Sequence, residues 1–564
     1  MFIPTTIEEA NKLGWDRFDV ILISGDTYVD SPYLGSAVIG HVLMDAGYRV
    51  GIIAQPDTGN GKDITRLGEP VLFWGVSSGS VDSMVANYTA TGKWRRQDDL
   101  TPGGENNRRP DRAVIVYSNL IRQYFKDTVP IVIGGIEASL RRVAHYDFRD
   151  NSIRRSILFD AKADILAYGM AERTVVELAQ CIKSGKDFHG LRGICYIAGY
   201  TINDYINLPS YEDTAQNKGE FMEMSRIYFG NCDPVNARGM VQKHGDRFLI
   251  HNPPSIPLSS EELDRVYELP YERDTHPFYK KLGTVRALDT IRFSITTHRG
   301  CFGGCNFCSI AVHQGSAVVS RSEGSIFREA KGFVRRPGFR GIIADIGGPT
   351  ANMYGMVCRS MERRGPCADK RCLGGHVCRT MSVSHKSQIS LLRKIRGIPG
   401  VRKSFVASGI RHDLVMADSR AGEEYLSEVV KNHVSGQLKI APEHCVDSVL
   451  ELMGKPSVES LLPFRDLFFR LTKQYRKKQF LTYYFIAAHP GSTLNHMKSL
   501  RWFVQNELHL DPEQVQIFTP LPSTWSTVMY YTGIDPFTGD QVFVERNNAE
   551  KEKQKKALGR PHKK

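Results

Sequence analysis

The first 200 residues alternate between short apolar runs and longer amphipathic stretches. Five apolar runs have the length and residue types of buried parallel strands, at 19–24, 48–54, 70–76, 129–135 and 163–169. A helical pattern over residues 34–47 separates the first two runs, and Gly47 is suited to end that helix. The alternation predicts an α/β fold with a doubly wound parallel sheet over residues 1–200, of the kind that binds ligands beyond the carboxyl ends of its strands.

The same alternation resumes near residue 286. Six strands are predicted, at 290–296, 340–346, 403–408, 436–440, 481–486 and 514–518, with helical stretches such as 457–478 between them. Six βα units predict a partial, open (β/α)6 barrel over residues 286–545. Residues 201–285 are rich in Pro, Asn, Tyr and charge without a clear period, and we interpret them as a connecting region.

Unusual residues follow every predicted strand of the second half. The first strand is followed by HRGCFGGCNFC, and the later ones by GGPT, SGIR, APEH, AHPGS and TPLPS. Gly and Pro at these points are also ordinary turn residues. Because the carboxyl ends of barrel strands face one cavity, six such ends with three thiols among them favour a shared active site.

Composition places the chain among ordinary globular proteins. It has 564 residues, of which 41% are hydrophobic and 24% charged, so that two or three domains are expected. We find no apolar stretch of 18 residues or more and no signal-peptide pattern at the N-terminus, and we expect a cytoplasmic protein without a membrane partner. In a reducing compartment, the odd number of 11 cysteines favours ligands, catalytic groups or core residues over disulfides.

Positive charge concentrates at the C-terminus. The formal net charge is +13, and residues 546–564 form a basic tail rich in Lys. Such a tail is ordinarily a solvated end, and contact with RNA is the second interpretation. An RNA or protein substrate therefore remains among the partners that we consider.

Three closely spaced cysteines carry the strongest chemical signal. Cys301, Cys305 and Cys308 follow the first barrel strand with C-x3-C-x2-C spacing, and Gly303 and Gly304 let the backbone approach inorganic sulfide. A structural zinc site normally takes four ligands, so three thiolates suit an iron–sulfur cluster with one open iron. The alternative is a structural metal site that borrows a distant fourth ligand.

This motif, with aromatic Phe307 just before its last cysteine, resembles that of the radical S-adenosylmethionine (SAM) superfamily. The whole chain resembles YgiQ-type radical SAM proteins more closely, through the segments VIGGIEASLRR, SITTHRGCFGGCNFCSI, DIGGPTANMYG and LKIAPEH. Gly347, Gly348 and Pro349 look like the glycine motif whose backbone contacts the SAM amino group in that superfamily. The later strand ends look like its remaining SAM-binding segments.

The resemblance implies an activity but no substrate. It implies that Cys301, Cys305 and Cys308 hold a 4Fe–4S cluster, that SAM chelates the fourth iron, and that reduction cleaves SAM to a 5′-deoxyadenosyl radical. It also implies an electron donor such as a flavodoxin or a ferredoxin. Glu443 is a candidate for SAM binding, although a hydrogen-bonded structural pair of Glu443 with His444 is an equal alternative.

The N-terminal sheet resembles the cobalamin-binding domain that precedes many radical SAM barrels. The D-x-H-x-x-G motif of that domain aligns with residues 26–31, where Tyr28 replaces His and Ser31 replaces Gly. His41 lies in a predicted helix and is more typical of packing than of cobalt ligation. We therefore expect a cobalamin-binding-like domain that retains no cobalamin, or one that is used for contact with a partner.

A second group of cysteines follows the glycine motif. It consists of Cys358, Cys367, Cys372 and Cys378, with His376 nearby, and its spacing matches no common zinc finger. An auxiliary iron–sulfur cluster, structural zinc and plain thiols all remain open for it.

Two other classes of function compete with a radical SAM enzyme. The main alternative is a nucleic-acid-binding protein with a structural metal and no SAM chemistry, and the other is an electron-transfer protein. Colour distinguishes a radical SAM enzyme from the nucleic-acid-binding alternative, since an iron–sulfur protein is brown and a zinc protein is colourless.

Overall fold

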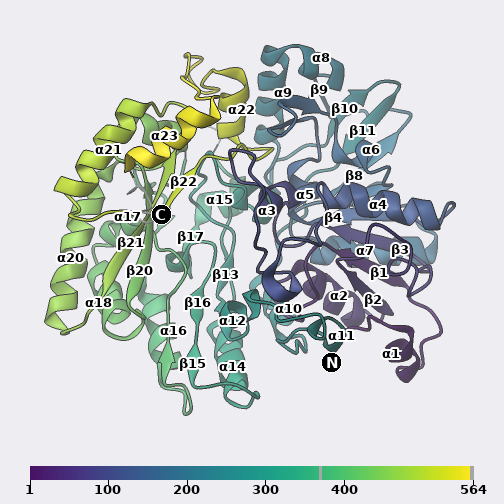
Figure 1. The fold of residues 1–564 in the computed structure, drawn as a ribbon, viewed down its shortest axis with the longest axis horizontal. Coiled ribbons are helices and arrows are strands. Elements are labelled where there is room, and N and C mark those ends of the chain that lie inside the picture. The colour runs from purple at the N-terminus through teal and green to yellow at the C-terminus, as the bar shows by residue number, and fades with distance from the viewer. Residues whose placement is uncertain (368–370, 513, 559–564) are drawn as a thin grey trace. The chain divides into compact units, whose positions relative to one another are not determined.

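The computed structural model describes residues 1–367, 371–512 and 514–558. Its chain divides into two compact units, the first with residues 1–258 and 265–292 and the second with residues 259–264 and those from Phe293 onward (Figure 1).

A nine-stranded sheet forms the centre of the first unit, in the order β2-β1-β3-β4-β7-β8-β11-β10-β9. Its strands are β1 (Val20–Ser24), β2 (Val50–Ala54), β3 (Phe73–Ser77), β4 (Ile131–Gly134), β7 (Ile165–Ala167), β8 (Ile194–Ala198), β9 (Ile206–Leu208), β10 (Met240–His244) and β11 (Arg247–His251). The five from β2 to β7 are parallel and coincide with the five apolar runs. This confirms the doubly wound part of the predicted fold.

Helices cover this sheet because its strands are apolar on both faces. Every residue of β1 and β2 is buried. Helices α2 (Gly35–Asp45) and α7 (Glu172–Ser184) share one core with side chains of β1, β2, β4 and β7. Helices α4 (Ala113–Tyr124) and α5 (Gly135–Leu140) pack against β3.

Residues 201–285, which we interpreted as a connecting region, contribute three strands to this sheet. They form β9, β10 and β11, and the pairs β7–β8, β8–β11 and β10–β11 are antiparallel, so the sheet is mixed. The polar residues Gln242, Lys243 and His244 in MVQKH hide β10 from a search for continuous apolar runs.

The second unit is an open arc of parallel strands. Parallel pairs join β12 (Ser294–Thr296) with β16 (Asp345–Gly347), β15 (Ile342–Ile343) with β19 (Lys403–Ser404), and β20 (Gln437–Glu443) with β21 (Phe480–Ala487) and then β22 (Gln514–Ile517). A parallel bridge between Ile410 and Ile440 continues the arc between β19 and β20. The partial barrel predicted from the sequence is thus confirmed.

The outer layer of this arc is helical. Its main helices share one core with β20 and β21, and they are α14 (Glu323–Val334), α16 (Lys386–Arg396), α18 (Gly422–Asn432), α20 (Leu461–Gln474) and α21 (Leu494–Asn506). Along β21 buried residues alternate with half-buried ones, so one face of the strand packs on helices and the other faces the interior of the arc. The first strand is shorter than predicted, because α12 (Ala287–Ile291) occupies the start of the segment 290–296.

Two short antiparallel ribbons lie near the strand ends. One pairs β13 (His298–Arg299) with β14 (Val319–Ser320), and the other pairs β17 (Val357–Cys358) with β18 (Met381–Ser382). The first ribbon closes the segment of Cys301, Cys305 and Cys308, and the second closes the segment of the other cysteine group.

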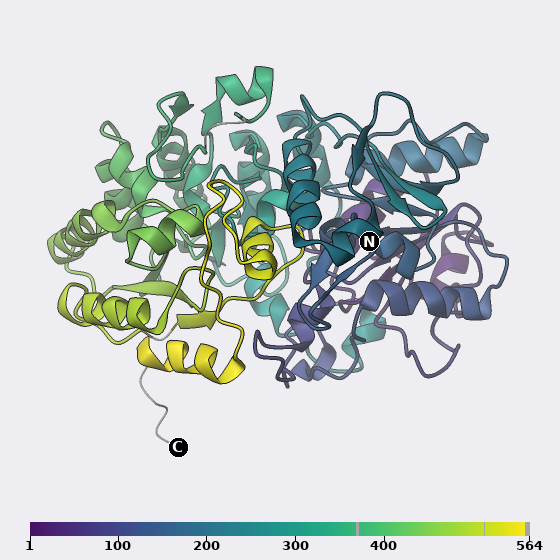
Figure 2. The ribbon, with the colours of Figure 1, turned by 90° about the horizontal axis from the view of Figure 1, so that it is seen from above.

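The basic tail is not the solvated end that its charge suggested. Residues Asn548–Leu558 form helix α23, which packs against α21 and β22 (Figures 1 and 2). Leu558 is 4% exposed in the core of the unit, and Lys551 is buried with its Nζ donating to Tyr530 Oη at 2.9 Å. The rest of the tail, residues 559–564, lies outside the described part of the chain.

Among the described residues, no helix has both the length and the apolar character that crossing a bilayer requires.

Candidate functional site

The loop that follows β13 carries the three closely spaced thiols. Gly300 opens this loop at φ +79°, and a Cβ there would lie 1.9 Å from the carbonyl oxygen of Ala317. Only glycine lets the two sides of the β13–β14 ribbon approach so closely. Cys308 donates its backbone N–H to the carbonyl of Cys305 at 3.1 Å, which folds the loop back on itself.

A space framed by sulfur lies within this loop. A Cβ added to Gly303 would be 3.2 Å from Cys301 Sγ and 3.6 Å from Cys305 Sγ. The negative charges of Cys301 and Cys305 help to raise the pKa of Cys308, although burial is the main cause and brings it to about 12. Thus Cys301 and Cys305 flank a volume that any side chain at position 303 would invade, and Cys308 is close enough to feel their charges. These residues fit an iron–sulfur cluster, because the three thiols share one loop and no side chain at position 303 fills the space between Cys301 and Cys305.

The far side of the loop is anchored to helix α19 (Asp447–Met453). The backbone N–H of Asn306 donates to the carbonyl of Met453 at 2.9 Å, and its side-chain amide donates to Leu452 at 2.8 Å. Phe307 packs against the apolar cluster of α19 and lies edge-on to the ring of His489. The aromatic residue before the last cysteine therefore fixes the loop rather than pointing into solvent.

The glycine motif lies directly beside the first thiol. Gly347 ends β16, and the hydroxyl of Thr350 lies 3.3 Å from Cys301 Sγ. A Cβ on Gly348 would fall 2.6 Å from the ring of His298, a buried residue whose pKa burial lowers to about 4. Gly347, Gly348 and Pro349 are thus adjacent to the thiol loop, and close packing on His298 is one physical reason for glycine at position 348.

Glu443 is a strained, buried carboxyl group at the end of β20. It adopts φ +70°, and the pairing with β21 shifts register just before it, so that a bulge re-aims its side chain. Its Oε1 lies 4.0 Å from Nζ of Lys455, but burial still raises its pKa to about 7. Strain of this kind is concentrated at functional sites.

Glu443 and His444 have separate hydrogen-bonding environments. His444 Nδ1 accepts the backbone N–H of Val446 at 3.1 Å, and its buried Nε2 has no partner among the described residues. Burial lowers the pKa of His444 to about 3, so the ring is neutral with its proton on Nε2. The alternative of a structural Glu443–His444 pair is therefore not the arrangement found here.

Two cations that the sequence did not single out lie beside the thiols. Arg411, after the third strand position, pairs with Asp413 at 2.6 Å, and its Nη1 would be 3.2 Å from a Cβ on Gly303. Burial raises the pKa of Cys305, while Lys455 and Arg411 oppose that rise. Cations in these positions favour thiolates and the negative charge of a thiolate-bound cluster. Thr350 and Arg411 lie in the strand-end segments GGPT and SGIR, whereas Lys455 follows helix α19, where no sequence pattern marked it.

The four cysteines of the second group lie in the segment closed by β17 and β18. Burial and the neighbouring thiols Cys358, Cys378 and Cys367 together raise the pKa of Cys372 to about 11, so the four are electrostatic neighbours. In the part of the chain that the structure describes, no three His, Cys, Asp or Glu side chains lie close enough for a single metal ion. This holds for both groups of cysteines.

The residues at the predicted cobalamin motif have other partners. Tyr28 is fully buried, and its hydroxyl accepts the backbone N–H of Ile3 at 3.0 Å. Asp30 bonds His41 Nε2 at 2.7 Å, and Asp26 forms an ion pair with Arg109 at 2.8 Å. The loops after β1 and β3 also touch, since a Cβ on Gly79 would lie 2.2 Å from the Asp26 carboxylate. These residues do not fit a lower cobalt ligand or an open cradle at this strand end.

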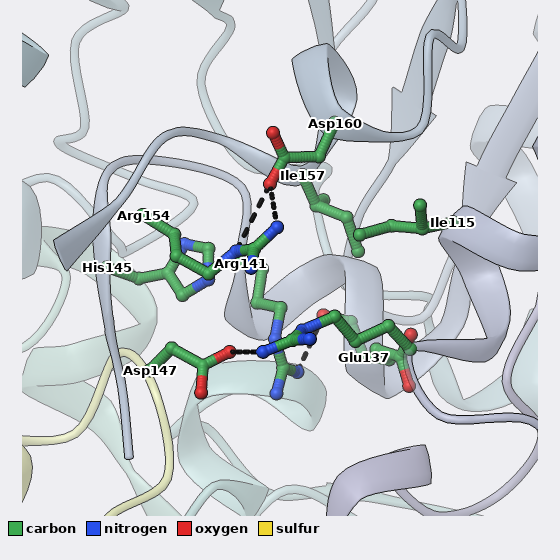
Figure 3. Close-up of a pocket in the computed structure, with 9 residues that line it drawn as sticks. Ile115, Glu137, Arg141, His145, Asp147, Arg154, Ile157 and Asp160 are labelled. Carbon is green, nitrogen blue, oxygen red and sulfur yellow. Dashed lines mark hydrogen bonds and ion pairs between the residues drawn. The ribbon is translucent and has the colours of Figure 1, made fainter. Parts of the chain in front are cut away.

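A polar pocket lies near the end of β4 in the first unit (Figure 3). Its charged side chains form ion pairs with one another: Arg112 pairs with Asp147 at 3.1 Å and Arg154 with Asp160 at 2.7 Å. Burial would raise the pKa of Asp147, but Arg141 and Arg112 bring it to about 2. With its charges matched internally, the pocket is better explained as a buried ion network than as a binding site.

Comparison with solved structures gives two radical SAM enzymes of low sequence identity. The radical SAM methyltransferase TsrM from Kitasatospora setae, with cobalamin and a [4Fe–4S] cluster bound, matches at 15% identity and a TM-score of 0.47, over 89% of this chain and 76% of that one. The cobalamin-dependent radical enzyme OxsB matches at 12% identity and a TM-score of 0.49, over 91% of this chain and 55% of that one.

Comparison with sequences is far stronger. Residues 2–294 match the family described as Radical SAM N-terminal. A UPF0313 protein of Fusobacterium nucleatum is 54% identical over 98% of both chains, and one of Thermotoga neapolitana is 50% identical over 97% of this chain and 96% of its own. A UPF0313 protein of Clostridium botulinum is 45% identical over 99% of this chain and 87% of its own. The chain therefore belongs to the UPF0313 family of the radical SAM superfamily.

Proposed function

We propose that this protein is a radical SAM enzyme in which Cys301, Cys305 and Cys308 hold a 4Fe–4S cluster whose fourth iron is open to SAM. One observation carries the proposal: Cys301 and Cys305 flank the space at Gly303, in a loop at the carboxyl ends of barrel strands that also carries Cys308. When bound, the cluster supplies one electron that cleaves SAM to methionine and a 5′-deoxyadenosyl radical, which abstracts hydrogen from a substrate.

The surrounding residues have distinct parts in this proposal. Backbone groups of Gly347, Gly348 and Pro349 meet the methionine end of SAM, next to Cys301 through Thr350. Lys455 and Arg411 balance negative charge at the thiols and the SAM carboxylate. We assign the carboxylate of Glu443, which follows the bulge in β20, to accept hydrogen bonds from the SAM ribose.

Anchoring of the loop keeps water away from the radical. Asn306 and Phe307 tie it to α19, and the apolar cluster of Val449, Leu450 and Met453 backs the ring of Phe307. A rigid apolar surface that excludes water favours hydrogen abstraction from the bound substrate over side reactions. We further propose an electron donor of the flavodoxin or ferredoxin class and a cytoplasmic setting, and an RNA or protein substrate remains our working hypothesis. No proposed step uses cobalamin.

SAM cleavage tests this function. Protein reconstituted anaerobically with iron and sulfide should be brown and, with dithionite, should convert SAM to 5′-deoxyadenosine and methionine. Cys301→Ala, Cys305→Ala and Cys308→Ala should each abolish product formation. Cys445→Ala is the matched control, because this thiol lies in the same unit and outside the loop, and it should retain activity.

Two outcomes would refute the proposal. Full activity in the Cys305→Ala protein would show that the loop does not hold the cluster. A colourless protein that binds zinc and cleaves no SAM would favour a structural metal site in a nucleic-acid-binding protein.

A further inference from the structure

The second group of cysteines is built into the fold in the same way as the first. In each case a two-residue antiparallel ribbon closes a cysteine-bearing loop, β13–β14 around one and β17–β18 around the other. In the second ribbon Cys358 pairs with Met381, which sets the start and the end of the segment side by side. Within it Cys378 donates its backbone N–H to the carbonyl of Cys372 at 2.8 Å. The backbone thus gathers three of the thiols.

The sulfur atoms themselves share a neighbour. The hydroxyl of Thr380 lies 3.1 Å from Cys378 Sγ and 3.9 Å from Cys358 Sγ. Each cysteine side chain has one rotatable bond, so each sulfur can change direction by changing rotamer.

The charge of the segment also suits thiolates. Between Cys358 and Arg379 the sequence carries six basic residues against two acidic ones. Arg371 is enclosed near Phe537, with its guanidinium 4.3 Å from the centre of that ring. A metal bound by four thiolates is a net anion, and this local cationic excess balances it.

From the gathering of three thiols by the backbone, with Cys367 as their electrostatic neighbour, we propose that Cys358, Cys367, Cys372 and Cys378 hold a second metal centre, ligated by thiolates and occupied by an iron–sulfur cluster or by zinc. Both occupants require the same soft sulfur ligands, and measurement of the bound metal distinguishes them.

The position of the segment would give this metal centre a structural role. Cys372 and Cys378 pack around a small core that contains Phe302 of the first loop and Leu373 of the second segment. The carbonyl of Leu373 also accepts a hydrogen bond from Arg411, at 3.2 Å. A metal at the second group would therefore hold residues 357–367 and 371–382 against the first loop.

Metal analysis of a variant that lacks the first site is the test. In Cys301→Ala/Cys305→Ala/Cys308→Ala protein, reconstituted anaerobically with iron and sulfide or with zinc, about one zinc or up to four irons per chain should remain. Adding Cys372→Ala and Cys378→Ala should remove that metal, whereas adding Cys445→Ala should not. Since the first site is absent from every protein in this series, the result is independent of the proposed SAM chemistry.

A second measurement guards against misfolding. Chelation of the metal from the triple variant should lower its thermal midpoint and speed proteolysis within residues 357–382, with circular dichroism reporting that the rest stays folded. A folded triple variant that retains neither iron nor zinc would overturn the proposal.

Discussion

Gly303 lies where a side chain would enter the space between the sulfurs of Cys301 and Cys305. Its added Cβ would lie 3.2 Å from Cys301 Sγ and 3.6 Å from Cys305 Sγ. We therefore predict that Gly303→Ala lowers the iron bound after anaerobic reconstitution several-fold, with little change in thermal stability. Iron analysis and absorbance in the visible charge-transfer region measure the effect.

Gly332→Ala is the matched control for this change. It places a methyl group in open space on helix α14 of the same unit, where nothing lies within 4 Å. This variant should bind iron as the parent does and be slightly more stable, because Ala favours a helix by about 1 kcal/mol over Gly. Equal iron in the Gly303→Ala and parent proteins would contradict the placement of the cluster.

At the residue scale, the sequence pointed to the proposed cluster ligands more readily than to the residues that surround them. Spacing alone singled out Cys301, Cys305 and Cys308, since loop ligands to one cluster must be close in the chain. Arg411 follows another strand and Lys455 follows helix α19, and only folding brings their charge to Cys305. The φ of +70° at Glu443 depends on a bulge in β20 and leaves no mark in the residue pattern.

Helix α23 shows that a highly charged element can be part of a core. Leu558 packs among helices of the second unit, and the side chain of Gln554 bonds both the N–H of Ala488 and the carbonyl of Ser492. We predict that Leu558→Ala lowers the free energy of unfolding by about 2–3 kcal/mol, the usual cost of truncating a buried leucine. Denaturant unfolding followed by circular dichroism gives this value.

Lys555→Ala provides the comparison on the exposed face of the same helix. Removal of this exposed charge should change stability by no more than about 0.5 kcal/mol. If both variants were equally stable, α23 would be a loosely attached element and the original interpretation as a solvated tail would stand.

Elements were predictable where their periodicity was strong. The five runs that became β2, β1, β3, β4 and β7 are apolar on both faces and could be read directly. Strands β9 to β11 are only three to five residues long and contain polar residues, and α23 has few apolar residues, so these segments do not stand out from loops in the sequence. Tertiary packing, rather than local preference, decides these segments.

The whole molecule encloses many neutral histidines. Burial lowers the pKa of seven of them to about 3 or about 4: His145, His244, His251, His298, His412, His444 and His489. An unfolded histidine has a pKa near about 6.5. Between these values the unfolded chain binds more protons than the folded one, so stability must fall as the pH falls from about 6.5 toward 4.

This sign leads to a prediction for acid sensitivity. Each histidine contributes at most about 1.4 kcal/mol of destabilisation per pH unit in that window. The urea midpoint of metal-free protein should decline steeply from pH 7 to pH 5, and calorimetry in two buffers should detect proton uptake on unfolding. A midpoint that is constant or rises toward pH 5 would show that these rings are not held neutral.

Magnetic resonance tests the proposed open iron most directly. Reduced protein that carries Cys372→Ala and Cys378→Ala, so that only the first site contributes, would be mixed with SAM labelled with ¹⁵N in its amino group and ¹⁷O in its carboxylate. We predict that SAM changes the electron paramagnetic resonance spectrum of the cluster and that both labels show hyperfine coupling to it. An unchanged spectrum without coupling, in protein fully loaded with iron and saturated with SAM, would contradict a three-cysteine cluster with an iron open to SAM.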